Sequence, residues 1–394
     1  MAKKTSVPPS ESKPAKGAAA QGNEKLAGKI ERLKAAAEKG NTSAQYGLAV
    51  LYASGQGVRK NSRTAFSWCH KAAKAGLADA QCVLGSLYLA GDGVEADGRE
   101  ALHWYLQAAE QAHALAQFSV GRLYLGGHGI GRDLLQAEYW FGRAAEQAYG
   151  PAQLELARMC DASHVRQATD WYRQAAENGV AEAQRILAGR YASGTGLTRS
   201  DDLAYAWYAK AALQGDAISQ WNLGVCHATG RGASQDYVKA MTCYRKAAEQ
   251  GMAAAQAAMG RMYANGQGVE QNFKLAAACF RKAAEQGDAE AFHNLALLYL
   301  EGKGISRKPE MAYKNFLCAA EQGVTQSLVY LGLMQARGDL GAPNLVEATK
   351  WFMLVKDDPV GQANLKIAKP MLKREALAEA TRLVKAWTQQ VGKT

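Results

Sequence analysis

The side chains that could do chemistry in this sequence are seven histidines and seven cysteines, and their spacing forms no recognised reactive site. The histidines make neither an HxxxH nor an HExxH pattern, and no two cysteines stand in CxxC spacing or in a Cys/His cluster suited to zinc. The sequence also lacks a Gly-x-Ser-x-Gly nucleophile turn, a P-loop with its lysine and a Rossmann strand. We therefore predict that the protein is not an enzyme and uses no cofactor or metal.

One glycine-rich run, at residues 126–131, looks able to hold a phosphate, since it reads Gly-Gly-His-Gly-Ile-Gly. A phosphate loop follows a strand, whereas this run follows a segment with helical periodicity. It also falls in the same register as turns elsewhere in the chain. A turn between two helices is therefore the favoured interpretation.

Those turns belong to an internal repeat, which is the most informative feature of the sequence. Nine small residues mark it at steps of 36 residues, with one shorter step of 31. They are Ala44, Ala80, Ala116, Ala152, Ala183, Ser219, Ala255, Ala291 and Ser327. Counted from each of these as offset zero, offset +4 is apolar, +5 is Gly or Ala, and +8 is usually Tyr. These offsets share one face of a helix, and the small residue at +5 predicts close contact with another helix.

A turn and a second helix complete each repeat. A Gly-x-Gly turn follows the first helix in seven repeats, and glycine suits this place because it permits positive φ. A residue of the N-cap type comes next, such as Asn61 or Asp97. The second helix then carries an invariant Ala, followed in six repeats by Trp three residues later. The pattern predicts alternating helices and tight turns.

The segment that begins at Ala291 and ends at Gly323 resembles a Sel1-like repeat, a 36-residue relative of the tetratricopeptide repeat. The resemblance covers residues 41–356. It implies an all-α fold, a right-handed α-solenoid of about nine helix-turn-helix repeats with helical caps. It also implies a non-catalytic protein-protein interaction scaffold or adaptor that binds a partner protein or peptide in its concave groove.

The repeat has two irregular members and two different ends. The fourth repeat lacks five residues and its Gly-x-Gly turn, and the ninth is degenerate, with Gln335 in the Tyr column. Residues 1–22 contain almost no large apolar side chain, which predicts a disordered basic tail. We expect residues 23–40 to form an N-terminal capping helix and residues 357–394 a C-terminal capping helix. A helix that binds a membrane surface or a partner is the alternative for the second segment.

Cysteine usage favours a reducing compartment. The family that this sequence resembles includes a cysteine-rich Helicobacter branch. In that branch a disulfide joins neighbouring repeats, at positions equivalent to Ala73 and Ala80 here. Because those positions hold Ala, this chain resembles the unbridged kind.

The N-terminal sequence lacks the apolar core of a signal peptide, and no stretch is apolar enough to span a bilayer. We expect a cytoplasmic protein with reduced thiols.

The net charge of +11 raises the alternative of a nucleic-acid binder. Most of this charge lies at the ends, with +5 in residues 1–42 and +3 in residues 357–394. The repeat region between the ends is nearly neutral. Binding of nucleic acid or of an acidic surface through the basic termini is therefore the weaker hypothesis. A regulatory subunit of a multi-protein enzyme is a further alternative. The sequence does not identify the partner or the oligomeric state.

Partner binding is expected on the first helices. By alignment with the tetratricopeptide pattern, offsets −1, +2, +6 and +9 should face the groove, where side chains are free to differ. Aromatic and apolar anchors beside arginines in the central repeats are typical of binding hot spots and of carboxylate recognition. The candidate partner-binding residues are Phe118, Arg122, Leu154, Arg158, Arg185, Trp221 and Arg261. We expect them to bind a segment with acidic groups. The alternative is that Phe118 and Trp221 fill space between neighbouring first helices.

A column of glutamines stands at offset +1. It holds Gln45, Gln81, Gln117, Gln153, Gln184, Gln220 and Gln256. So regular a column predicts a hydrogen bond between helices rather than a ligand site.

Overall fold

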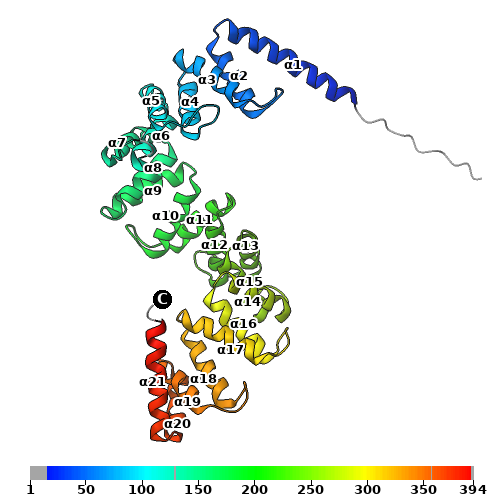
Figure 1. The fold of residues 1–394 in the computed structure, drawn as a ribbon, viewed down its shortest axis with the longest axis vertical. Helices are drawn as coiled ribbons and strands as arrows, with labels where there is room; N and C mark the ends of the chain where they lie inside the picture. Colours follow the sequence, from blue (N-terminus) through cyan, green and yellow to red (C-terminus); the bar gives the residue numbers. More distant parts are fainter. Residues whose placement is uncertain (1–15, 128–129, 356, 392–394) are drawn as a thin grey trace, which may run out of the picture. The chain divides into compact units, whose positions relative to one another are not determined.

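The computed structural model describes residues 16–127, 130–355 and 357–391. Within these ranges the regular secondary structure is helical throughout, and no strand occurs. The chain divides into two compact bodies, which we call the N-terminal body (residues 1–180) and the C-terminal body (residues 181–394). Figure 1 shows that each body is built from consecutive helical hairpins. The predicted all-α fold is therefore confirmed.

The N-terminal body holds one long helix and four hairpins. Its helices are α1 (Lys16–Glu38), α2 (Thr42–Ser54), α3 (Ser62–Lys74), α4 (Ala78–Ala90), α5 (Gly98–Glu110), α6 (Ala114–Gly126), α7 (Leu134–Ala145), α8 (Gly150–Cys160) and α9 (Val165–Glu177). The shortened fourth repeat still forms a hairpin, from α8 and α9. Its short connection is held by Tyr172, whose hydroxyl donates to Asp161 Oδ2 at 3.1 Å.

The C-terminal body holds five hairpins and two further helices. The hairpin helices are α10 (Ala181–Ser193), α11 (Asp201–Leu213), α12 (Ala217–Thr229), α13 (Tyr237–Glu249), α14 (Ala253–Asn265), α15 (Phe273–Glu285), α16 (Ala289–Glu301), α17 (Pro309–Glu321), α18 (Thr325–Arg337) and α19 (Leu345–Leu354). After them come α20 (Pro359–Ala368), a short 3-10 turn η1 (Lys369–Met371) and α21 (Arg374–Val391).

Caps fix where the helices of a hairpin begin and end. In the second repeat, α4 ends at Gly91, which adopts a left-handed φ of 70° and returns its backbone N–H to Leu87. Asp97 then caps α5 by accepting from the backbone N–H groups of Arg99 and Glu100. These interactions satisfy helix-end groups that would otherwise lack partners. The turn at residues 126–131 ends α6 in the same way, with Gly127 at φ 69°. Its residues 128 and 129 lie outside the described ranges.

Close contact within a hairpin depends on the small residue at offset +5. A Cβ added at Gly121 would lie 2.6 Å from the Phe141 ring, and one at Gly224 would lie 2.6 Å from Tyr244. The first helix therefore lies directly against an aromatic side chain of the second. This is the helix contact that the sequence predicts at offset +5.

Close contact between hairpins depends on the second glycine of the turn. A Cβ added at Gly93 would lie 2.3 Å from the backbone oxygen of Ser62, which belongs to the preceding repeat. Gly304 makes a similar approach to the backbone of Phe273. The turns at Gly93 and Gly304 therefore pack on the start of the previous second helix, as do those at Gly232 and Gly268.

The glutamine column forms a recurring set of hydrogen bonds within each body, which we call the glutamine ladder. Gln81, Gln117, Gln153, Gln220 and Gln256 each donate Nε2 to a backbone oxygen at the end of the preceding second helix, eight residues earlier. Each also accepts an amide hydrogen from the residue that ends the next second helix, as Gln117 does from Gln147 at 2.7 Å. The prediction of an inter-helix hydrogen bond is confirmed.

The two ends differ from expectation in their helix boundaries. The helix α1 begins at Lys16, so residues 16–22 are helical and not part of a disordered segment. The run Ala18–Ala20 explains this, because Ala is the strongest helix former. The rest of the predicted tail, residues 1–15, lies outside the described ranges. The C-terminal segment holds two helices where one was expected, and Pro370 in η1 accounts for the break between them.

Candidate binding surface

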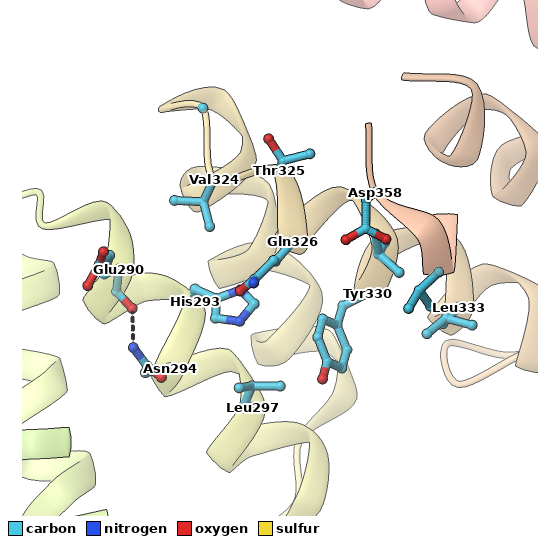
Figure 2. A pocket seen from close by; sticks show the side chains of 13 residues that line it. Glu290, His293, Asn294, Leu297, Val324, Thr325, Gln326, Tyr330, Leu333 and Asp358 are labelled. Carbon is cyan, nitrogen blue, oxygen red and sulfur yellow. Dashed lines mark hydrogen bonds between the residues drawn. The ribbon is translucent and has the colours of Figure 1, made fainter. Parts of the chain in front are cut away.

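A pocket of about 870 Å³ lies between α16, α18 and the start of α20, all within the C-terminal body (Figure 2). Offsets −1, +2 and +6 of the eighth and ninth repeats all line it. These residues are Glu290, His293, Leu297, Gln326, Val329 and Leu333. We call this cavity the terminal pocket. It lies on the columns that the sequence assigns to partner binding, although not in the central repeats.

The far wall of the terminal pocket comes from α20. Asp358 caps this helix by accepting the Gly361 backbone N–H at 2.8 Å, and Val360 follows in the first turn. A Cβ on Gly361 would lie 3.5 Å from Val329 and 3.0 Å from Val355. The contact with Val355 is the tight one, so the lack of a side chain at Gly361 lets α20 begin close to the end of α19, with Asp358 at the rim of the pocket.

His293 lies at the base of the terminal pocket and is 8% exposed. Its Nδ1 is 2.8 Å from the Ser327 hydroxyl, and its ring contacts Phe316 and Tyr330 edge-on. Burial lowers the pKa of His293 below its ordinary value of 6.5, because desolvation disfavours the charged imidazolium. The ring is therefore neutral near neutral pH. Figure 2 shows His293, Gln326 and Tyr330 gathered between the two first helices.

The predicted binding residues of the N-terminal body mostly pack within the chain. The Phe118 ring is half-buried, at centroid distances of 5.6 Å from Phe141 and 5.4 Å from Tyr149. Leu154 is buried. The Phe118 ring thus contacts the second helix of its own repeat and Tyr149, which precedes α8, and partner binding by these residues stays a prediction.

The two arginines of that body differ in their surroundings. Arg158 forms an ion pair with Glu155 of the same helix at 2.5 Å. Arg122 lies over the Phe118 ring at 6.0 Å and forms no ion pair with the described residues. A carboxylate partner would therefore find Arg122 more available than Arg158.

In the C-terminal body the predicted arginines already contact carboxylates. Arg185 lies 3.4 Å from Glu182 and 3.5 Å from Asp216, and Arg261 lies 2.9 Å from Glu290. These pairs reduce the positive potential that the sequence suggests. The Trp221 ring packs on a buried cluster that includes Tyr244 of α13 and Met262 of α14.

Comparison with known proteins decides the family. The model of the Sel1 repeat family matches residues 42–77, 78–113, 114–149, 151–180, 181–216, 217–252, 253–288, 289–324 and 325–352. The chain belongs to the Sel1 repeat family.

Two solved Sel1 repeat structures resemble it along most of its length. One is c5321, a protective antigen present in uropathogenic Escherichia coli strains that displays an SLR fold. It is 30% identical, with a TM-score of 0.64 over 92% of this chain and 87% of that chain. The other is a Sel1 repeat protein from Oxalobacter formigenes, 30% identical, with a TM-score of 0.55 over 77% of this chain and 90% of that chain. No curated protein matches the sequence.

The binding residues predicted from the sequence of this Sel1 repeat protein do not include those that line the terminal pocket. Two signals in the sequence point there. The glutamine column ends with the seventh repeat, since Phe292 and Leu328 take its place in the last two. His293 is also the one histidine in the +2 column. Both changes show that the last two Sel1 repeats have a different first-helix surface.

No group of three or more His, Cys, Asp or Glu side chains in the described ranges could hold a metal ion. The seven cysteines carry free thiols, and burial raises the pKa of Cys69 to about 12. A thiol with so high a pKa is a poor nucleophile. None of the helices in the described part of the chain has the length and apolar character needed to cross a bilayer.

Proposed function

We propose that this chain is a non-catalytic interaction scaffold that holds a partner protein or peptide on the face formed by its first helices. Sel1 and tetratricopeptide-like repeats generally serve as protein-interaction scaffolds. One observation carries the proposal for this chain: all six residues at offsets −1, +2 and +6 of the last two repeats line the terminal pocket.

The composition of the terminal pocket supports a polypeptide ligand. Leu297, Val329 and Leu333 supply apolar contact, while Asn294 and Gln326 supply side-chain amides. Apolar walls with a few polar groups are typical of sites that fix the orientation of a ligand. Amide and carboxylate groups suit the backbone and side chains of a peptide.

The test is affinity capture from host extract with the wild type and with Leu297→Asp/Leu333→Asp, followed by mass spectrometry. The control is Leu213→Asp/Val238→Asp, which makes the same chemical change at exposed positions away from the pocket. Thermal unfolding of each variant should establish that it is folded. We expect a partner that is lost from the pocket variant and retained by the control. Equal capture by all three proteins would contradict the proposed site.

The same experiment separates the alternatives. Capture at low and high salt tests binding of nucleic acid through the basic termini, because phosphate contacts weaken steeply as salt rises. A third variant, Arg122→Glu/Arg158→Glu/Trp221→Ala, tests the residues predicted from sequence. Loss of the partner from this variant alone would move the site to the central repeats. If the captured partner is an enzyme, the chain acts as a regulatory subunit.

A further inference from the structure

The polar lining of the terminal pocket is rich in hydrogen-bond acceptors. Its thirteen lining residues include the carboxylates of Glu290 and Asp358 but no lysine or arginine. The Asn294 amide nitrogen donates to the Glu290 backbone oxygen at 2.8 Å, as Figure 2 shows, so its carbonyl oxygen remains as an acceptor. Amide and hydroxyl groups such as Gln326, Thr325 and Tyr330 can also donate, but the charged groups of the lining are both carboxylates, and an anionic pocket favours a ligand that brings N–H donors and positive charge.

The two carboxylates are still able to take such a ligand. Asp358 uses Oδ1 for the Gly361 backbone N–H, which leaves Oδ2, and it forms no ion pair with a residue in the described ranges. Glu290 pairs with Arg261, but both side chains are well exposed, at 71% and 43%. An exposed pair of this kind is worth little, so a partner cation can share or replace it.

His293 provides a second and independent observation. Its side chain is more than nine-tenths buried and lies against the cavity, and only Nδ1 has a hydrogen-bond partner among the described residues. The neutral ring adds no positive charge to the pocket. Its Nε2 has no hydrogen-bond partner among the described residues and is not one of the fully buried polar atoms, so a ligand in the pocket can reach it.

We propose that the terminal pocket recognises a partner segment in which a lysine or arginine lies beside an apolar side chain. The cation lies between Glu290 and Asp358 at the rim, and the apolar side chain contacts Leu297 and Leu333. This inference rests on the proposed function and names the chemistry of its ligand. It replaces the acidic ligand expected from the arginines of the central repeats, most of which have carboxylate partners within the chain.

The test is selection of a random peptide library, displayed on phage, against the full chain. Enriched peptides are synthesised, and their affinities are measured for the wild type, Glu290→Gln/Asp358→Asn and Leu297→Asp/Leu333→Asp. Asn at position 358 can still cap α20, and Gln at position 290 can still accept from Arg261. The control Glu310→Gln/Glu321→Gln removes the same charge at exposed positions outside the pocket.

We expect enriched peptides to contain Lys or Arg next to an apolar residue, and Glu290→Gln/Asp358→Asn to weaken them about tenfold or more. The control should change affinity less than about twofold. Peptides that need Leu297 and Leu333 but are neutral or acidic would overturn this inference and leave the proposed function intact. Peptides that bind all variants equally, or no enrichment at all, would overturn both.

Discussion

Gln147 Nε2 lies 2.7 Å from Gln117 Oε1, and Gln117 in turn donates to the backbone oxygen of Ala109 at 3.0 Å. One fully buried side chain thus joins three helices, the second helix of one repeat and both helices of the next. The same arrangement recurs in both bodies. The glutamine column therefore connects neighbouring repeats, and this structural role explains why the column varies so little along the chain.

Removing a member of the glutamine ladder should destabilise the protein. Gln117→Ala removes one hydrogen bond from the Ala109 carbonyl, which keeps the Ala112 N–H, and one from the Gln147 amide, which keeps a long contact to the Arg143 oxygen. We expect a loss of about 1–3 kcal/mol of unfolding free energy. Urea denaturation followed by circular dichroism measures the change. Gln107→Ala, on the exposed face of α5, is the matched control and should stay within about 0.5 kcal/mol of wild type. Equal effects of the two variants would refute the role of the ladder.

A glycine within a first helix should resist replacement by alanine. In an open helix this change usually stabilises by about 0.5–1 kcal/mol. Gly121→Ala would instead place a Cβ 2.6 Å from Phe141, so we expect destabilisation of about 1–3 kcal/mol. Gly142→Ala on α7, where nothing lies within 4 Å, should be neutral or stabilising. Thermal unfolding compares the pair, and Phe141→Leu should partly rescue Gly121→Ala.

Replacing the second glycine of a turn should destabilise the protein more than replacing another glycine that also has positive φ. Gly93 and Gly76 both have positive φ, so alanine costs each about 1 kcal/mol in backbone strain. Only at Gly93 would a Cβ also meet the Ser62 backbone, at 2.3 Å. We expect Gly93→Ala to lower the urea midpoint clearly further than Gly76→Ala. If the two midpoints coincide, the contact between repeats does not limit stability.

His293 should make the stability of the C-terminal body depend on pH. Its pKa in the folded protein lies below the ordinary value of 6.5, so the unfolded state binds the proton more readily. Its contribution is therefore complete above pH 6.5 and is lost as the pH falls below that value. We expect wild type to lose more stability than His293→Asn between about pH 7.5 and about pH 5.5. His70 and His227, whose pKa values are also lowered, remain in both proteins.

The neighbours of His293 allow the pH effect to be assigned. Glu290 on α16, Tyr330 on α18 and Asp358 before α20 line the same pocket. Desolvation is the cause of the lowered pKa of His293. Denaturation curves at both pH values for wild type, His293→Asn and Glu290→Gln measure each contribution. A pH dependence that persists in His293→Asn would place its origin in other groups.

The hairpins were predictable because their signals are local. A helix with a small residue at +5, a glycine such as Gly91 and a cap such as Asp97 each act over a few residues. The ends were harder to predict. The start of α1 at Lys16 depends on helix propensity, which outweighed the polar composition of that segment.

The sequence predicted which offsets of a repeat face the candidate site, but not which repeats form it. The alignment identified three offsets, −1, +2 and +6, that line the terminal pocket. The far wall of the pocket comes from α20, which lies outside the repeats and could not be predicted from their periodicity. The helix α20 follows the last repeat, and Gly361 lets it pack closely against Val355. The arginines of the central repeats were predicted to bind acidic groups of a partner, and the sequence did not show that Arg261 pairs with Glu290 of the next repeat.

The direction of the glutamine ladder has a consequence for synthesis on the ribosome. Each glutamine donates to a carbonyl eight residues earlier in the chain, and its own oxygen accepts from a residue that is made later, as Gln81 accepts from Gln111. The acceptor therefore always leaves the ribosome before the donor. Within each body, a new hairpin that carries the glutamine can bond to the finished one before it, so a growing chain exposes chiefly the apolar face of its newest hairpin.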